Sequence, residues 1–407
     1  MESQNLRFQN TSGLMLSGIL DLPITREAKA YALVAHCFTC GKNLVAMRNI
    51  SRTLTREGIA VFRFDFMGLG NSEGDFSETN FSSNVADLID AATYLEKHYQ
   101  APKLLIGHSL GGPAAIMAST QLSSCQAVVT IGSPYDPEHV THLFQALKTI
   151  IRRKGEATAN IGGRHLTIKK QFLDDLENIS MRSVISSLKK ALLVCHSPVD
   201  TTVGIEQAAN IYGAAKHPKS FISLDDADHL LTKEKDSLYI GEVIASWAKR
   251  YINLPIDTGP VVRGKKQYVI VRSEGEDYTT EINANGHALI ADEPIALGGK
   301  NLGPSPYELL ASSLGACTAM TLQMYAKYKK LHLDSVTVYL QHNKVHAEDG
   351  AGCENKAKKI DVIERKIEVK GNLSEKQRER LLEIADRCPV HQTLRKSVKI
   401  KSWLGEN

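Results

Sequence analysis

Residues 103–112 read KLLIGHSLGG, and this short stretch decides how the N-terminal half of the chain is expected to fold. The apolar run Lys103–Ile106 predicts a buried strand, and the pattern over Leu110–Leu122 predicts a helix. Ser109 lies between them, inside a G-x-S-x-G motif that runs from Gly107 to Gly111. Small residues on both sides let the chain turn tightly enough for the serine hydroxyl to project from the turn. The stretch therefore predicts a strand, a sharp turn that presents a nucleophile, and a helix.

Strands and helices alternate on both sides of this turn. Amphipathic stretches at Asn43–Glu57 and Asn84–His98 predict helices between the strands. Five further apolar runs predict strands: Ala30–His36, Ala60–Phe66, Ala127–Ile131, Ala191–Cys195 and Lys219–Leu224. This alternation predicts a mostly parallel, doubly wound sheet covered by helices on both faces, with functional groups at the carboxyl ends of its strands. Residues 134–190 are polar, contain Gly162-Gly163 and interrupt the alternation. We expect an inserted cap there; a loose helical connection is the alternative.

A serine hydroxyl needs a base to become nucleophilic. The order expected in this type of fold is serine, then acid, then histidine. Asp200 follows the strand at Ala191–Cys195, and His229 lies in a polar loop after the strand at Lys219–Leu224. We therefore predict Asp200 as the acid and His229 as the base. The other candidates are the acids Asp225, Asp226 and Asp228, too near His229 in sequence, and the bases His36 and His196, in the wrong chain order.

An acyl oxygen that becomes negative needs preset backbone N–H donors. We expect one from Leu110, which follows the nucleophile, and one from Phe38, in the loop after the strand Ala30–His36. The segment RFDFMGLGNS at 63–72 belongs to the next strand–loop junction and is interpreted as a glycine-rich turn that supports the site.

Residues 14–250 resemble the α/β-hydrolase superfamily. The stretch RFDFMGLGNSEGDF at 63–76 is similar to that of feruloyl- and cinnamoyl-type esterases and of serine aminopeptidase-like lipases. The resemblance implies hydrolysis of small acyl esters. One departure is Cys37, which stands where many relatives have glycine.

The pattern changes after Tyr251. Residues 253–264 (NLPIDTGPVVRG) look like a linker, so we place a hydrolase domain at 1–252 and a second domain at 265–407. In the second domain a long helix is predicted at Pro306–Lys329 and another at Ser374–Asp386. Predicted strands are Gln267–Arg272, Tyr278–Asn283, His287–Ile290, Ser335–His342, Lys359–Val369 and Ser397–Lys401. This order predicts an α+β fold.

The chain has seven cysteines, an odd number that argues against a framework of structural disulfides: Cys37, Cys40, Cys125, Cys195, Cys317, Cys353 and Cys388. Cys37 and Cys40 form a C-x-x-C motif. Such a motif can be a redox pair, half a zinc site, or two small residues that fill a tight loop. Cys317 lies within a predicted apolar helix, where a cysteine is often an inert small apolar residue. Cys388 follows the helix predicted at Ser374–Asp386, where the helix dipole does not favour a thiolate.

Residues 265–407 resemble the OsmC/Ohr family of hydroperoxide reductases. The motifs are GPSPYELL at 303–310, Gly315-Ala316-Cys317 and Cys388-Pro389-Val390-His391. The resemblance implies that Cys317 attacks a hydroperoxide, that Cys388 resolves the sulfenic acid to a disulfide, and that a thiol reductant restores both. It also implies supporting roles for Glu308 and His391 and an intertwined homodimer. Well-studied members of the family have a glutamate at the position of Tyr307 in this chain. They also use an arginine from an early strand to hold the thiolate, and Arg263 and Arg272 are the candidates here.

Composition excludes some other classes of protein. A chain of 407 residues with a formal net charge of +4 suits two globular domains and gives no sign of a nucleic-acid or membrane partner. With no signal peptide at Met1–Gln9, we expect a cytoplasmic protein that needs no metal or organic cofactor. The expected function is a serine esterase joined to a thiol-dependent hydroperoxide reductase. The alternatives are a C-terminal domain that only dimerises or binds, a degenerate hydrolase scaffold, and acyl transfer in place of hydrolysis.

Overall fold

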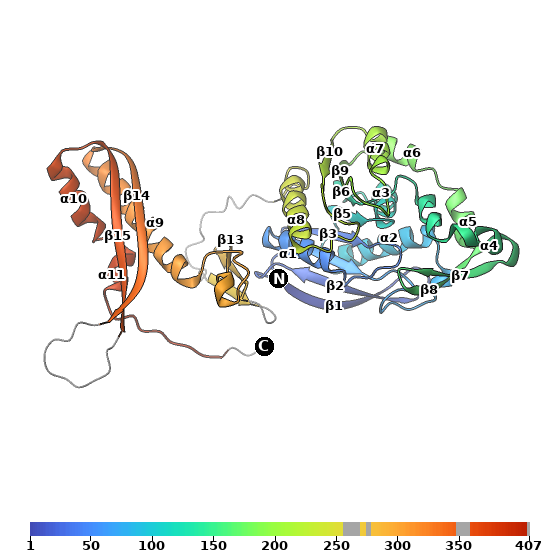
Figure 1. Ribbon diagram of the computed structural model, residues 1–407, viewed down its shortest axis with the longest axis horizontal. Coiled ribbons are helices and arrows are strands. Elements are labelled where there is room, and N and C mark those ends of the chain that lie inside the picture. The colour runs from blue at the N-terminus through green and yellow to red at the C-terminus, as the bar shows by residue number, and fades with distance from the viewer. Residues whose placement is uncertain (255–268, 274–277, 347–358, 405–407) are drawn as a thin grey trace. The chain divides into compact units, whose positions relative to one another are not determined.

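The computed structural model describes residues 1–254, 269–273, 278–346 and 359–404 (Figure 1). The chain divides into two compact units, one formed by Met1–Arg272 with Asn283–Ala288 and the other by Ser273–Ile282 with Leu289–Asn407. Most of the expected linker, residues 255–264, lies outside the described residues, as do Arg263 and Cys353.

The first unit is built on an eight-stranded sheet in the order β1–β2–β4–β3–β5–β6–β9–β10. Neighbouring strands from β4 to β10 run parallel, whereas β1, β2 and β4 pair antiparallel. The strands are β1 (Glu2–Gln9), β2 (Met15–Leu22), β3 (Ala30–Ala35), β4 (Ile59–Phe64), β5 (Leu104–His108), β6 (Ala127–Ile131), β9 (Ala191–His196) and β10 (Lys219–Ser223). The expected mostly parallel sheet is confirmed.

The hairpin of β1 and β2 is not among the strands that the sequence predicts. Phe8 is the fully buried residue of β1, because this edge strand has one face against the core and the other in solvent. Such a strand lacks the continuous apolar run that marks the central strands.

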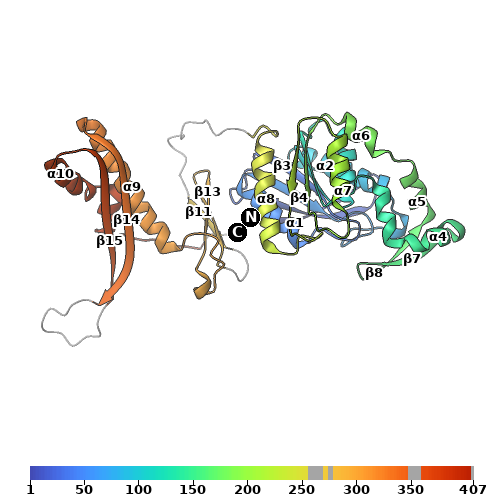
Figure 2. The same cartoon turned by 45° about the horizontal axis from the view of Figure 1, so that its top comes forward.

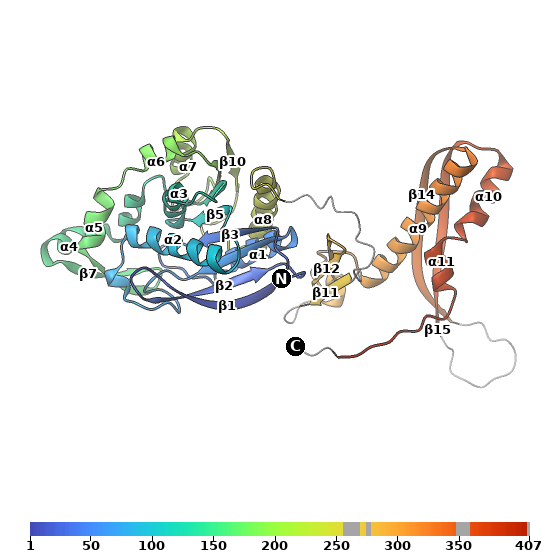
Figure 3. The same cartoon turned by 180° about the vertical axis from the view of Figure 1, so that it is seen from behind.

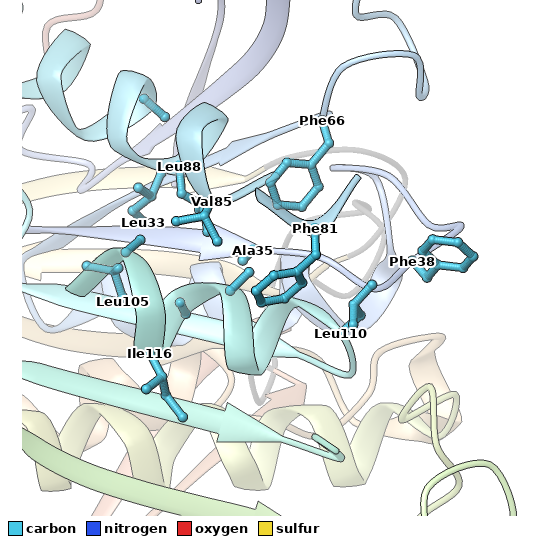
Figure 4. Packing of buried hydrophobic residues seen from close by; sticks show 14 of the residues in the cluster. Leu33, Ala35, Phe38, Phe66, Phe81, Val85, Leu88, Leu105, Leu110 and Ile116 are labelled. Carbon is cyan, nitrogen blue, oxygen red and sulfur yellow. The ribbon is translucent and has the colours of Figure 1, made fainter. Parts of the chain in front are cut away.

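Helices cover both faces of the sheet (Figures 1 and 2). Side chains alternate across β3, so Leu33 and Ala35 pack in one apolar cluster, and Ala32 and Val34 pack in another. The first cluster includes α2 (Phe81–His98), α3 (Gly111–Gln121) and α7 (Ile205–Ala214), and the second includes α1 (Val45–Arg56) and α8 (Glu234–Lys249). Figure 4 shows part of the first cluster, in which Leu33 and Ala35 lie beside Leu88 and Val85 of α2. Buried apolar layers on both faces hold the carboxyl ends of the parallel strands in place.

The segment between β6 and β9 is an ordered insertion and not a loose connection. Buried side chains such as Phe144, Phe172 and Leu173 join it to the main core. Its elements are the 3₁₀ helix η2 (Pro137–Leu147), α4 (Lys148–Lys154), the antiparallel strands β7 (Glu156–Ile161) and β8 (Arg164–Lys169), α5 (Lys170–Glu177) and α6 (Met181–Ser187). We call residues 134–190 the cap.

The C-terminal part of the chain is α+β, as predicted. A three-stranded sheet has the order β11–β12–β13, and a long two-stranded sheet joins β14 to β15. Helix α9 lies along the two long strands (Figure 3). The elements are β11 (Val269–Ser273), β12 (Thr280–Ala284), β13 (His287–Ala291), α9 (Pro306–Lys329), β14 (His332–His346), β15 (Lys359–Asn372), α10 (Glu375–Ala385) and α11 (Pro389–Leu394). Short 3₁₀ turns lie at η1 (Phe76–Glu78) and η3 (Ile295–Leu297).

Helix α9 has the predicted bounds because its start is encoded locally. The Ser305 hydroxyl accepts the N–H of Glu308, and the Glu308 carboxylate accepts the N–H of Ser305, which is a capping box.

The strand predicted at Ser397–Lys401 is wrong. Its alternating residues match a strand, but Val398 and Ile400 are exposed and no partner strand lies beside them among the described residues. A strand without a partner has no hydrogen-bond ladder to stabilise it. Within the described part of the chain, no helix combines the length and the apolar character needed to cross a membrane.

Candidate active site

The turn at Ser109 has the geometry that the G-x-S-x-G motif predicts. Ser109 has a positive φ of 52°, and its N–H donates to the carbonyl of Ile131 on β6 at 2.9 Å. A Cβ atom at Gly107 would lie 2.2 Å from the carbonyl oxygen of Gly111, and one at Gly111 would lie 2.3 Å from that of Ala35. Only glycine fits at these two positions, and their close approach holds the serine between β5 and α3.

Ser109, His229 and Asp200 form a hydrogen-bonded chain. The Nε2 atom of His229 lies 3.1 Å from Ser109 Oγ, and its Nδ1 atom lies 2.7 Å from Asp200 Oδ2. Ser109 follows β5, Asp200 follows β9 and His229 follows β10, so all three are at the same edge of the sheet. Ser109 is half-buried, and His229 keeps 12% of its side-chain surface exposed. A small molecule can therefore approach the serine, while the carboxylate is shielded.

The carboxylate of Asp200 is held in its charged form. Burial on its own would raise the pKa of Asp200, but hydrogen bonds from His229 and from the N–H groups of Thr202 and Val203 hold that pKa below its usual value. A charged carboxylate at this place fixes the ring of His229 and favours a proton on its Nδ1 atom.

The rival acids and bases are engaged elsewhere. His36 and His196 are buried, and each donates a ring N–H to a backbone carbonyl, that of Cys37 at 2.7 Å and that of Val203 at 2.8 Å. The rival acids sit at the surface loop before α8: Asp228 accepts from Leu230 and Thr232, Asp225 from Ser223, and Asp226 pairs with Lys233 and Lys235.

Phe38 and Leu110 lie together at the margin of the core (Figure 4). Both residues are buried. Among the residues that the structure describes, the N–H of neither donates to a protein acceptor. The ring of Phe38 packs against Phe76 at 5.3 Å and Phe172 of the cap at 5.4 Å between ring centroids. The N–H groups of Phe38 and Leu110 are thus both unpaired among the described residues, and the Phe38 ring is held by rings from two different segments.

A buried ionic network supports the Phe38 loop, whereas the sequence predicts only a glycine-rich turn that supports the site. Lys42 and Asp65 form a buried ion pair, and the N–H of Lys42 also donates to Asp65 at 2.7 Å. Arg63 pairs with Asp21 at 2.7 Å and donates to the carbonyl of Lys42. The N–H of Asn71 also donates a hydrogen bond to the carboxylate of Asp65, at 2.9 Å. The sequence signal for this network is a pair of charged residues that alternate with apolar ones at the end of a buried strand, as in Arg63-Phe64-Asp65.

The C-x-x-C motif forms a disulfide between Cys37 and Cys40, with Cα atoms 5.2 Å apart. The two residues are therefore a bonded pair and not simply small residues that fill a loop. Cys37 is buried, whereas Cys40 is half-buried. The described residues contain no group of three or more histidine, cysteine or acidic side chains placed to hold a metal ion.

In the C-terminal part, Cys317 and Cys388 are unpaired thiols on neighbouring elements. Thr318, the residue after Cys317 on α9, has its Oγ1 atom 3.7 Å from Cys388 Sγ. Cys317 is half-buried and Cys388 is fully buried. The expectation that Cys388 lies at a helix end with no helpful dipole needs correction. Because Pro389 starts a new helix, Cys388 is the N-cap of α11, and its sulfur accepts the N–H of His391 at 3.3 Å.

The arginine beside this pair is neither of the two that the sequence suggested. Arg365 of β15 donates to Thr318 Oγ1 at 2.8 Å, to the carbonyl of Ala385 at 3.2 Å and to Asp386 at 2.7 Å. Arg272 lies on β11, and Arg263 is outside the described residues. No sequence motif marks Arg365, because its partners come from two helices that are far from it in sequence.

Glu308 and His391 differ in how they relate to the cysteines. Glu308 caps α9, and nine residues of helix place it about 13 Å along the axis from Cys317. Within one chain it supports the helix and not the thiol. His391 lies one turn after Cys388, and its buried Nε2 atom has no hydrogen-bond partner among the described residues.

A sheet of this order, with a strand–serine–helix turn, an acid after β9 and a histidine after β10, defines the first unit as an α/β hydrolase. The sequence model described as serine aminopeptidase, S33 matches residues 27–178, and that of OsmC-like proteins matches residues 298–402. An esterase domain from Rhodothermus marinus is 48% identical over 62% of this chain and 100% of that domain, with a TM-score of 0.53. The chain belongs to the α/β-hydrolase family of this esterase and carries an OsmC-like domain at its C-terminal end.

Two further similarities are weaker. Est1E from Butyrivibrio proteoclasticus, in a structure with bound ferulic acid, is 18% identical over 61% of this chain and 99% of its own, with a TM-score of 0.51. That likeness supports the fold alone. Monoglyceride lipase from Rattus norvegicus is 32% identical over 95 residues, which are 23% of this chain and 31% of the lipase.

Proposed function

We propose that the first domain hydrolyses carboxylic esters through an acyl-enzyme formed on Ser109. The single observation that carries this proposal is the double hydrogen bond of His229, to Ser109 at 3.1 Å and to Asp200 at 2.7 Å. The 48% identity to an esterase domain supports the choice of esters.

In this mechanism His229 takes the proton of Ser109 as its hydroxyl oxygen attacks the ester carbonyl carbon. The carbonyl oxygen becomes negative and receives hydrogen bonds from the N–H groups of Phe38 and Leu110. His229 then returns the proton to the departing alcohol, and the C–O bond of the ester breaks. Water, activated by the same imidazole, releases the acid in the second half of the cycle. Asp200 stabilises the imidazolium that forms twice in each turnover.

The test is the hydrolysis of p-nitrophenyl acetate by the full chain and by Ser109→Ala. We expect the variant to lose at least about 10³-fold in kcat, because it removes the hydroxyl that His229 contacts among the described residues. Ser119→Ala is the matched control, since this serine lies on α3, the helix that follows Ser109, and its hydroxyl donates to the carbonyl of Ile116 at 2.7 Å. Equal kcat in Ser109→Ala and the wild type would refute the proposal.

We propose further that the C-terminal domain reduces organic hydroperoxides. The half-buried Cys317 thiolate would attack the peroxide, release the alcohol and become a sulfenic acid. The Cys388 thiol would then attack that sulfur, form a disulfide and release water, and a dithiol reductant would restore both thiols. The contact of Thr318 with Cys388 at 3.7 Å supports this pairing, because it sets Cys388 beside the turn of α9 that bears Cys317.

A second candidate role for this domain is dimerisation without catalysis. Met320, Met324 and Tyr328 are spaced four residues apart on one side of α9 and are 65%, 72% and 78% exposed. An apolar stripe of this kind favours a partner surface, and we infer a homodimer formed through this domain. Consumption of cumene hydroperoxide with dithiothreitol, lost in Cys317→Ser, would support catalysis. A dimeric wild type that consumes no peroxide would leave dimerisation as the function.

A further inference from the structure

The loop that carries Phe38 contains chemistry that ester hydrolysis does not use. The disulfide between Cys37 and Cys40 closes a ring of four residues, and Phe38 and Thr39 are the two residues inside it. Among the described residues the N–H of Phe38 donates to no protein acceptor, and it is one of the two donors proposed above for the negative acyl oxygen. Any change at the disulfide therefore acts on the backbone next to this donor.

We propose that Cys37 and Cys40 are a reversible thiol modification site, which a dithiol reduces and an organic hydroperoxide oxidises, and which sets the rate of ester hydrolysis. The proposal rests on the esterase function proposed for Ser109. The disulfide form is the active one, and the dithiol form hydrolyses esters more slowly.

Accessibility of the two sulfurs supports a reversible site. Cys40 is half-buried and Cys37 is buried, so an incoming thiolate reaches Cys40 first and Cys37 becomes the leaving group. The other buried cysteines of the same domain differ: burial raises the pKa of Cys125 to about 12, which keeps its thiol protonated and inert. The bonded pair is the reactive set among the cysteines of the first unit.

The oxidation and reduction steps balance without a metal or cofactor. In oxidation, one thiolate attacks the hydroperoxide oxygen, the O–O bond breaks, the alkoxide takes a proton and leaves as an alcohol, and the cysteine becomes a sulfenic acid. The second thiol then displaces the hydroxyl, so that an S–S bond forms and water leaves. In reduction, a dithiol forms a mixed disulfide with Cys40 and releases Cys37. Its second thiol then closes its own disulfide, so that two electrons and two protons pass to the protein.

The structure explains why the disulfide affects the rate. Three contacts locate the loop from outside: the bond from His36 to the carbonyl of Cys37 at 2.7 Å, the ion pair of Lys42, and the cap, whose Phe172 ring lies 5.4 Å from that of Phe38 between centroids. The disulfide constrains the part between them. Removing one oxyanion donor from a serine hydrolase lowers kcat by about 10²–10³. A loop that holds this donor only part of the time should lose less, and we expect a decrease of about 5- to 20-fold in kcat with little change in KM.

The experiment follows the disulfide and the activity in the same sample. The full chain is incubated with reduced dithiothreitol, with oxidised dithiothreitol, or with cumene hydroperoxide, then alkylated with iodoacetamide and cut with trypsin. Cleavage after Lys29 and Lys42 yields a single peptide that contains both cysteines. We expect two alkyl groups on that peptide after reduction and none after oxidation. We also expect kcat for p-nitrophenyl acetate to follow the oxidised fraction reversibly.

Two variants sharpen the result. Cys40→Ser should have the low kcat of the reduced protein and should not respond to dithiothreitol, whereas Cys125→Ala should respond as the wild type does. The proposal is overturned if the peptide takes up two alkyl groups in every condition, or if kcat is the same in the oxidised and reduced wild type. Failure of the esterase proposal is distinct, because Ser109→Ala would then retain activity whatever the state of the peptide.

Discussion

The Nε2 atom of His108 lies 2.7 Å from the backbone carbonyl oxygen of His229, so the residue just before the nucleophile also holds the base. His108 is completely buried and comes from the end of β5, whereas His229 lies in the loop after β10. Burial, with a contribution from the nearby His229 imidazole, lowers the pKa of His108 to about 4. At neutral pH His108 is therefore uncharged and donates its Nε2 proton to that carbonyl.

Removal of this donor should lower the rate of ester hydrolysis. We expect His108→Leu to lose about 10-fold in kcat with KM nearly unchanged, because an unpaired buried carbonyl costs about 1–3 kcal/mol and the His229 loop shifts to relieve it. His108→Gln keeps a donor and should stay within about threefold of the wild type. Stopped-flow or steady-state kinetics with p-nitrophenyl acetate measures both. Equal losses in the two variants would mean that His108 acts only by packing.

The lowered pKa of His108 also predicts how stability depends on pH. Between its ordinary pKa of 6.5 and about 4, the unfolded chain binds a proton at this residue and the folded chain does not. The free energy of unfolding should therefore fall as pH falls through this window, by about 3 kcal/mol from His108, and should not change through this residue above it. Urea unfolding at pH 7 and pH 4.5, followed by Trp247 fluorescence in a Trp403→Phe background, measures the change. The free energy of unfolding of His108→Gln should decrease less between these two pH values. An equal decrease in the variant and in the protein with His108 would contradict the prediction.

Gly111 should not tolerate a methyl group. A Cβ at this position would lie 2.3 Å from the carbonyl oxygen of Ala35 and 2.7 Å from that of His36, so Gly111→Ala must push α3 away from β3. We expect a loss of stability of about 1–3 kcal/mol and a decrease of at least about 10-fold in kcat, because the N–H of Leu110 moves with the helix. Gly213→Ala is the control: no atom lies within 4 Å of its Cβ, and it should stabilise α7 by about 0.5–1 kcal/mol. Thermal unfolding measures the change in stability, and ester kinetics measures the change in kcat. A Gly111→Ala variant with the kcat of the wild type would contradict the prediction, because the turn would then accommodate a methyl group.

Asp200 is predicted to act through His229 alone. Asp200→Asn keeps the size of the side chain but removes the charge that favours a proton on His229 Nδ1, and we expect kcat to fall by about 10²–10⁴. Asp225→Asn, in the exposed loop near His229, should leave kcat within about twofold. A large decrease for Asp225→Asn and none for Asp200→Asn would reassign the acid.

Arg365 should matter for any reaction at Cys317 and Cys388. Its guanidinium joins Thr318 of α9, the helix that carries Cys317, to Ala385 and Asp386 at the end of α10, which ends just before Cys388. We expect Arg365→Met to lower consumption of cumene hydroperoxide by at least about 10-fold, and Arg365→Lys to restore little, because one ammonium cannot reach three acceptors. Arg380→Gln, which removes an exposed pair with Glu383, is the control. The rate of disulfide formation between Cys317 and Cys388 after one equivalent of peroxide is the direct measurement, and wild-type rates in Arg365→Met would exclude the role.

Features encoded by neighbouring residues could be read from the sequence. The turn at Ser109 follows from two glycines that flank one serine, and α9 starts where Ser305, Pro306 and Glu308 form a cap. The central strands of the sheet are continuous apolar runs because both of their faces are buried. Chain order alone selected Asp200 and His229 from among several acids and histidines. These inferences succeed because each depends on residues a few positions apart or on a fixed order of strands.

Contacts between distant segments were decided by the tertiary structure alone. Ser109 and His229 are 120 residues apart, and they meet because β5, β6, β9 and β10 end at the same edge of the sheet. The ion pair of Lys42 with Asp65 and the bonds of Arg365 to two helices have no motif, because their partners lie on elements whose spacing in sequence is arbitrary. An alternating pattern also becomes a strand only where a neighbouring strand can pair with it. The edge strand β1 pairs with β2, whereas residues 397–401 have no strand beside them among the described residues. Local sequence determined which elements form, and the packing of those elements decided which side chains meet.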